Sequence, residues 1–159
     1  MRKIGLLFTF LFLLTMIGQA QSMEKLFKKY ADDERFEYTS VGKGMLGIFS
    51  RFADYSEITD GVLQKITGLK VLQLDSEKTS TALLASFTKD IDKIIDKGKY
   101  ETTLEKRGKN SKTYIYRKVN RKLNAEYVIL TNELGSTTLV WLKGKANPQY
   151  EKEREMEEM

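Results

Sequence analysis

A basic segment rich in tyrosine holds the residues of this sequence best suited to binding a ligand. Residues 97–122 contain ten lysines and arginines against two acids, Glu101 and Glu105. Within this segment residues 112–118 alternate as in a β-strand, where successive side chains point to opposite faces. The spacing therefore predicts one face that carries Lys112, Tyr114, Tyr116 and Lys118.

Such a face is suited to an anionic polymer or a lipid headgroup, because lysines attract the charge and tyrosine rings offer a stacking surface. The alternative is an ordinary solvated strand, whose lysines protect a sheet edge from pairing with other chains. The sequence leaves both interpretations open.

Carboxylates form the second group, because they do chemistry without histidine. Glycoside cleavage uses two facing acids about 5 to 9 Å apart. The available acids are Asp75, Glu77, Asp90 and Asp92. Their spacing selects no pair, and Asp90 and Asp92 would point about 200° apart on a helix. Most of them fit a solvated face, and a small carboxylate-dependent hydrolase acting on envelope polymer remains an alternative.

Residues 42–47 match the glycine pattern G-x-G-x-x-G, between a predicted strand and a predicted helix. A dinucleotide site also needs an acid about 20 residues further on, and Asp75 comes later than that. The strand before the glycines alternates, whereas the first strand of a nucleotide-binding sheet is continuously apolar. We therefore interpret the glycines as a tight strand-to-helix junction.

The pattern Ser-x-x-Lys, found in serine acyl-enzymes, begins at Ser22, Ser40 and Ser86. The partner motifs Lys-Thr-Gly and Ser-Asp-Asn are missing, so chance in a lysine-rich chain explains the matches. The sequence has no histidine and no cysteine. Ser-His and Cys-His nucleophiles and the usual zinc sites are thereby excluded, and we predict no catalytic residue, metal site or cofactor.

The first twenty residues have the features of a secretory signal. Arg2 and Lys3 precede an apolar run over residues 4–17, and Gly18-Gln19-Ala20 places small residues where signal peptidase cleaves. The run is shorter than the roughly 20 residues that span a bilayer. We expect cleavage between Ala20 and Gln21, a mature protein without a transmembrane span, and a periplasmic or secreted location. Nucleic acid is then not an expected partner.

The mature chain begins with helices and ends with strands. Apolar spacing predicts helices over residues 22–30, 45–52 and 58–66, and strands over residues 36–41 and 69–74. A stripe from Leu84 to Ile95 predicts a helix over residues 80–97, with Gly98 at its C-cap. Short turns then separate strands over residues 100–104, 112–119, 126–131 and 137–142.

This order predicts an α+β fold, a two-layer sandwich with helices on one face of a mostly antiparallel sheet that ends in a four-strand meander. Residues 21–147 form the single domain, after the signal peptide of residues 1–20. Residues 148–159 hold five glutamates against Lys152 and Arg154, and we expect a charged, flexible tail there.

Several short strings together resemble one family. They are Phe36-Glu37-Tyr38-Thr39-Ser40, Gly44-Met45-Leu46-Gly47-Ile48-Phe49, the apolar string of residues 68–74, and Leu139-Val140-Trp141-Leu142-Lys143-Gly144. Behind a signal peptide, this layout resembles the exported bacterial family described as domain of unknown function forty-two fifty-two, over residues 22–146. The resemblance implies a Gram-negative cell-envelope setting and an envelope stress-response role. It implies no established activity and supplies no functional residues.

The function that the sequence favours is an exported, non-catalytic cell-envelope module that binds an envelope protein or an anionic envelope component. An apolar groove or an exposed sheet face would support it. The small hydrolase predicts a deep pocket with two facing carboxylates. An adhesive or structural subunit, the third hypothesis, predicts a long exposed strand edge.

Overall fold

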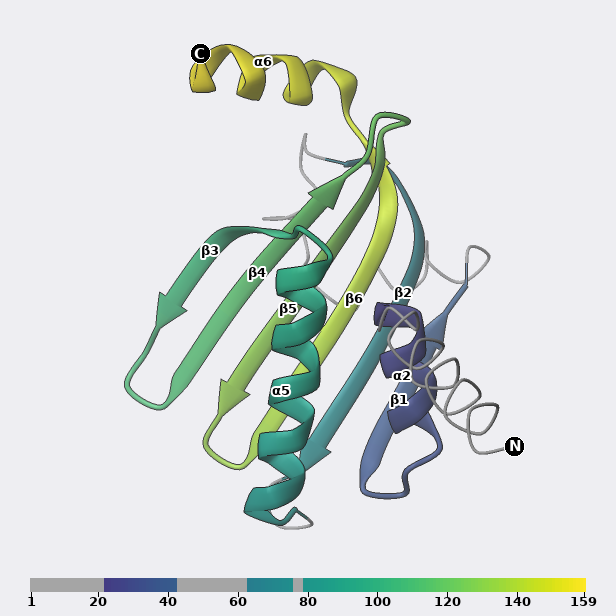
Figure 1. Ribbon diagram of the computed structural model, residues 1–159, viewed down its shortest axis with the longest axis vertical. Helices are drawn as coiled ribbons and strands as arrows, with labels where there is room; N and C mark the ends of the chain where they lie inside the picture. Colours follow the sequence, from purple (N-terminus) through teal and green to yellow (C-terminus); the bar gives the residue numbers. More distant parts are fainter. Residues whose placement is uncertain (1–21, 43–62, 76–78) are drawn as a thin grey trace, which may run out of the picture.

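Six antiparallel strands form one sheet in the part of the chain that the structure, a computed structural model, describes, which is residues 22–42, 63–75 and 79–159 (Figure 1). The strands lie in the order β1-β2-β6-β5-β4-β3. Along the chain the elements are α2 (Met23–Ala31), β1 (Phe36–Val41), β2 (Leu63–Asp75), α5 (Thr81–Lys97), β3 (Glu101–Arg107), β4 (Ser111–Val119), β5 (Asn124–Glu133), β6 (Ser136–Ala146) and α6 (Pro148–Glu158).

The predicted α+β class and the closing meander are confirmed. Strands β3 to β6 follow one another in space as in sequence, each antiparallel to the next. Short turns leave no room for the crossover that parallel neighbours need. The sheet has no parallel pair among the described strands, so the architecture of a nucleotide-binding sheet is absent there.

The prediction of a helix over residues 58–66 is wrong from Leu63 onward, because strand β2 begins there. Its pairing with β6 shifts register between Leu63 and Lys65 and again between Ile66 and Gly68. Each shift moves the inward-facing positions by one residue, which hides the period of two that marks a strand. The predicted helix over residues 45–52 and most of the glycine pattern lie outside the described residues.

Helices α2 and α5 begin where the sequence predicts. The Ser22 hydroxyl accepts a hydrogen bond from the Lys25 amide at 3.3 Å, and the Ser80 hydroxyl accepts one from the Leu83 amide at 3.2 Å. These N-caps satisfy backbone donors that the first turn leaves unpaired. Neither these helices nor any other in the described residues is long and apolar enough to cross a membrane.

Both helices lie on the same face of the sheet, as predicted (Figure 1). Their buried side chains join those of four strands in one core cluster, whose aromatic buried members are Phe27, Tyr30, Phe36, Phe87 and Trp141. A second buried cluster lies on the opposite face and includes Leu69, Tyr127, Ile129 and Leu142. The central strands β5 and β6 are consequently apolar on both faces.

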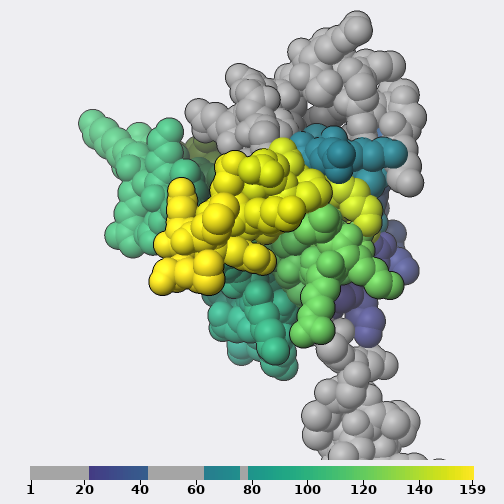
Figure 2. Space-filling view, turned by 90° about the horizontal axis from the view of Figure 1, so that it is seen from above, coloured from purple at the N-terminus to yellow at the C-terminus, as the bar shows by residue number. Residues whose placement is uncertain are grey.

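The charged segment at the C-terminus corrects a prediction, because a helix stands where we expected a flexible tail. Residues 148–158 form α6, with the Asn147 side chain accepting a hydrogen bond from the Gln149 amide at 3.1 Å and Pro148 in the first turn. None of these eleven residues is buried, and Figure 2 shows the helix on the surface at one end of the sheet. Since α6 lacks an apolar stripe, hydrophobic periodicity does not reveal it.

Gly144 on β6 is the place where the sheet tolerates no side chain. A Cβ atom there would clash with the backbone carbonyl oxygen of Lys65 on β2, beside one of the register shifts. We expect Gly144→Ala to lower the free energy of unfolding by about 1–3 kcal/mol, as overpacking does. Gly68→Ala is the matched control, since a Cβ at that position meets no atom within 4 Å. Equal urea midpoints for the two variants would contradict this interpretation.

Candidate functional site

A cleft of about 460 Å³ opens where the first turn of α2 and the last turn of α5 meet the sheet. We call it the lysine cleft. Its walls include Met23 and Glu24 from α2, and Ile94 and Lys97 from α5. Its floor and far wall are formed by Tyr100, Lys118, Glu126, Trp141 and Lys143. The cleft therefore combines residues from both layers of the fold.

Strand register places opposite charges side by side on the floor of the lysine cleft. Glu126 on β5 lies directly opposite Lys118 on β4 and directly opposite Lys143 on β6. Directly opposed side chains on neighbouring strands are close enough to interact. The row thus presents two ammonium groups with one carboxylate between them.

Two aromatic donors hold that carboxylate in place. The Tyr100 hydroxyl donates to Oε2 of Glu126 at 3.2 Å, and the Trp141 indole Nε1 donates to Oε1 at 3.2 Å. Burial raises the pKa of Tyr100, and the negative charge of Glu126 raises it further. Both oxygens of Glu126 are thereby engaged, so this carboxylate orients the floor of the cleft.

Lysine ammonium groups lie over the same aromatic rings. Lys143 Nζ is 4.3 Å from the centroid of the Trp141 ring, and Lys118 Nζ is 5.3 Å from that of Tyr100. Both distances lie within the range of a cation–π interaction. These contacts fix the lysines at the rim of the cleft. Lys97 adds a third, exposed ammonium group from the last turn of α5.

Glu24 forms the acidic part of the wall. Its carboxylate accepts a hydrogen bond from Lys70 Nζ at 2.9 Å and lies 4.0 Å from Lys143 Nζ. The hydrogen bond from Lys70 outweighs partial burial and lowers the pKa of Glu24. The lining has three lysines against two glutamates, and both glutamates are already bound to donors. A ligand in the lysine cleft therefore meets an excess of ammonium groups.

The four residues predicted to share a face lie along β4, and the structure spreads them over its length. Lys118 lines the lysine cleft, whereas Lys112 lies near the hairpin tip, where its ammonium group is 5.2 Å from the centroid of the Tyr114 ring. Tyr114 and Tyr116 stack between them with ring centroids 6.0 Å apart. Six residues of strand span about 20 Å, so Lys112 and Lys118 belong to different sites.

The remaining cleft residues were not singled out from the sequence. Trp141 lies in the strand predicted over residues 137–142, Lys143 directly follows it, and Tyr100 begins another predicted strand. Nothing in the sequence pairs these residues with Glu126. Their meeting depends on the register between β4, β5 and β6. The detectable signal was the spacing of two between Trp141 and Lys143, which places both side chains on the same face of β6.

Asp90 and Asp92, the two predicted carboxylates on α5, do not form a catalytic pair. Asp90 accepts hydrogen bonds from Lys29 Nζ at 2.6 Å and from the Tyr30 hydroxyl at 2.8 Å, which links α5 to α2. Burial alone would raise the pKa of Asp90, but these bonds outweigh it and lower the pKa. Burial, together with nearby Asp96, raises the pKa of Asp92. Glu77 lies outside the described residues.

Two of the Ser-x-x-Lys patterns, those that begin at Ser22 and Ser86, lie wholly within the described residues. The Ser22 hydroxyl caps α2 by accepting a hydrogen bond from the Lys25 amide, and Ser86 and Lys89 are exposed on α5.

Buried tyrosines make the fold sensitive to high pH. Burial raises the pKa of Tyr30, Tyr100, Tyr116 and Tyr127 above 10.0. As pH rises, the unfolded chain therefore loses the hydroxyl protons of these tyrosines before the folded chain does. Their contribution to the free energy of unfolding is complete below about pH 10 and is lost as pH rises further. We expect the free energy of unfolding to fall above that pH, and to fall less steeply in Tyr100→Phe. Parallel pH profiles for the two proteins would contradict the role given to Tyr100.

The fold and the cleft define a class, an α+β module with two helices over one face of an antiparallel sheet and a lysine-lined cleft between the layers. Within this class the chain belongs to the family described as Domain of unknown function (DUF4252), whose model matches residues 30–152. No curated protein and no solved structure matches the chain. The match spans β1 to the first turn of α6 and includes the floor of the lysine cleft.

Proposed function

We propose that this chain is an exported, non-catalytic cell-envelope module that binds an anionic component of the envelope in the lysine cleft. The observation that carries the proposal is the convergence of Lys97, Lys118 and Lys143 on one cleft with two aromatic rings. A phosphate or carboxylate group gains charge-assisted hydrogen bonds from such lysines, about twice as strong as neutral ones.

Export supports an envelope partner. The N-terminal sequence has the three parts of a secretory signal, with a positive start, an apolar run and small residues at the cleavage position. Anionic lipids and phosphorylated or acidic polysaccharides are the abundant anions of such a compartment. Phosphate and carboxylate groups are the chemistry that these partners share.

The small hydrolase is the weaker candidate, although Glu24 and Glu126 both line the lysine cleft. A glycosidase needs one carboxyl group whose pKa is raised, so that it donates a proton to the leaving group. The pKa of Glu24 is lowered instead, and Glu126 accepts hydrogen bonds through both oxygens. Glu24 is therefore not suited to donate a proton to a leaving group, and Glu126 is engaged in positioning Tyr100 and Trp141.

The adhesive subunit is disfavoured by the chemistry of the exposed edge. Strand β3 is exposed along all seven residues and ends the sheet. Four of the seven are charged, namely Glu101, Glu105, Lys106 and Arg107. Charged side chains on a short edge strand oppose pairing with another strand.

Binding by the lysine cleft is tested with a double variant, Lys118→Ala with Lys143→Ala. We expect its affinity for phosphatidylglycerol-containing vesicles, or for phosphorylated oligosaccharide prepared from the envelope, to fall about tenfold or more, since a hydrogen bond to a charged group contributes roughly 1.5–3 kcal/mol. The two probes distinguish a lipid headgroup from a polysaccharide phosphate as the source of the anion. Affinity should also fall with added salt.

The matched control removes the same charge elsewhere. Lys89→Ala with Lys112→Ala takes two lysines from the outer face of α5 and the far end of β4, outside the lysine cleft. We expect this control to bind nearly as the unaltered protein does. Equal losses in the two double variants would reduce the effect to net charge and overturn the proposed site.

A further inference from the structure

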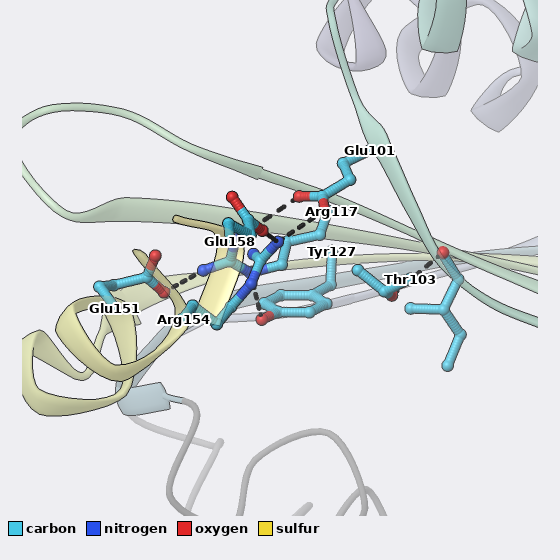
Figure 3. A network of polar contacts seen from close by, with 8 residues as sticks. Glu101, Thr103, Arg117, Tyr127, Glu151, Arg154 and Glu158 are labelled. Carbon is cyan, nitrogen blue, oxygen red and sulfur yellow. Dashed lines mark hydrogen bonds and ion pairs between the residues drawn. The ribbon is translucent and has the colours of Figure 1, made fainter. Parts of the chain in front are cut away.

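A buried arginine holds α6 against the sheet. Arg117 on β4 is 5% exposed, and its Nε donates to the Tyr127 hydroxyl at 2.9 Å (Figure 3). Its Nη2 contacts Glu151 of α6, and its Nη1 lies 3.9 Å from Oε2 of Glu101 of β3. Arg154 of α6 completes the set with a 2.6 Å ion pair to Glu101. We call the three of these residues that lie on strands, Glu101, Arg117 and Tyr127, the arginine clasp.

The arginine clasp recognises acidity in the docked helix. Residues 148–158 carry five glutamates, Lys152 and Arg154, a net charge of −3. Arginine stays protonated at every accessible pH, so a buried Arg117 requires an acidic partner. No side chain of α6 is buried, and ion pairs, hydrogen bonds and a ring contact between Arg117 and Tyr150 attach it to the strands. The seat of α6 is therefore a receptor for an acidic helix.

The connection to α6 is short and leaves the sheet at a defined point. The Ala146 amide donates to the Leu123 carbonyl at 2.8 Å, which anchors the end of β6, and the helix begins two residues later at Pro148. A change of backbone angles between these two points would redirect the whole helix. The core clusters would stay intact, because α6 contributes nothing to them.

We propose that α6 also docks in trans, so that the α6 helices of two copies exchange and each occupies the arginine clasp of the other. The occupant is a second copy, because its α6 reproduces the charge complementarity that the clasp shows in one chain. An exchanged element makes the same contacts as before, so exchange costs little beyond association. This surface lies on the opposite face of the sheet from the lysine cleft, and the proposal does not depend on the proposed function.

Mixing two charge-reversed variants tests the exchange. In Arg117→Glu the clasp repels its own helix, and in Glu151→Arg the helix repels its own clasp. A mixture restores opposite charges at both clasps, but only between copies. We expect each variant alone to sediment as a monomer and the equimolar mixture to sediment as a dimer. Two variants that fold by circular dichroism and stay monomeric when mixed would overturn the proposal.

A milder pair guards against misfolding of the Arg117 variant. The chain has no cysteine, so Glu101→Cys in one copy and Arg154→Cys in another place one thiol on each side of an ion pair. Exchange predicts a mixed disulfide between the two variants as the main oxidised product, identified by mass. Mixed and self-paired disulfides in the proportions of random pairing would contradict docking in trans.

Discussion

Phe87→Ala should lower the free energy of unfolding by about 3–5 kcal/mol, the range for deleting a buried aromatic ring. Phe87 is fully buried in α5, and its ring centroid lies 4.8 Å from that of Tyr30 and 4.9 Å from that of Phe36. The three rings join α2, β1 and α5. Their loss therefore loosens both helices at once, which also removes the walls of the lysine cleft.

Urea unfolding followed by circular dichroism measures this effect. A domain of this size has a total stability of roughly 5–15 kcal/mol, so the alanine variant should stand close to its unfolding threshold. Phe87→Leu is the milder comparison and should cost less, because it refills much of the cavity. A loss under about 1 kcal/mol in the alanine variant would contradict the position of α5 over the sheet.

Glu151→Ala should be the second most damaging change, with an expected loss of up to about 3 kcal/mol. It removes the carboxylate from Arg117, and an unpaired buried charge costs roughly 3–5 kcal/mol. The loss stays near the lower limit, because α6 contributes no buried side chain and can leave the sheet so that water reaches the arginine. We expect reduced helical circular dichroism together with the loss of stability.

Glu155 offers the matched control on the same helix. It is exposed, and Glu155→Ala removes the same charge one turn further along. We expect that control to change stability by less than about 0.5 kcal/mol, as surface substitutions do. If both alanine variants lost the same stability, the effect would arise from the loss of one negative charge on α6, and the role of the arginine clasp would be wrong.

The elements with one apolar stripe were predictable from sequence. Helix α5 shows Phe87, Ile91 and Ile94 at helical spacing, and the structure buries those residues. The N-caps at Ser22 and Ser80 were also predictable, because a serine before a run of apolar residues at helical spacing indicates the start of a helix. Where an element is buried on one face only, its apolar residues recur at the period of a helix or a strand, and this period predicts the element.

The incorrect predictions concern two elements that lack a regular apolar face, the start of β2 and helix α6. The start of β2 shifts register twice against β6, so its inward side chains follow no fixed period. Helix α6 buries nothing, and Glu151 and Arg154 attach it through contacts with residues far away in sequence. Hydrophobic periodicity reports burial against a core, so it cannot detect an element that polar pairs hold in place.

The candidate site was predictable only in part. Lys118 was named from the alternation of β4, and it lines the lysine cleft. Its neighbours Glu126 and Lys143 come from two other strands, and only the register between strands brings the three together. The sequence predicts on which face of its strand each residue lies, but it does not predict which residue of the neighbouring strand lies opposite.

Trp141 provides the most direct measurement of binding in the lysine cleft. It is the only tryptophan in the sequence, it is 4% exposed, and its indole donates to Glu126 beneath the rim lysines. Titration with phosphatidylglycerol vesicles or with phosphorylated envelope oligosaccharide should change its fluorescence to saturation, and the midpoint should move to higher concentration with added salt. A ligand that is retained by the protein while the Trp141 emission stays constant at every concentration would place binding elsewhere and contradict the account.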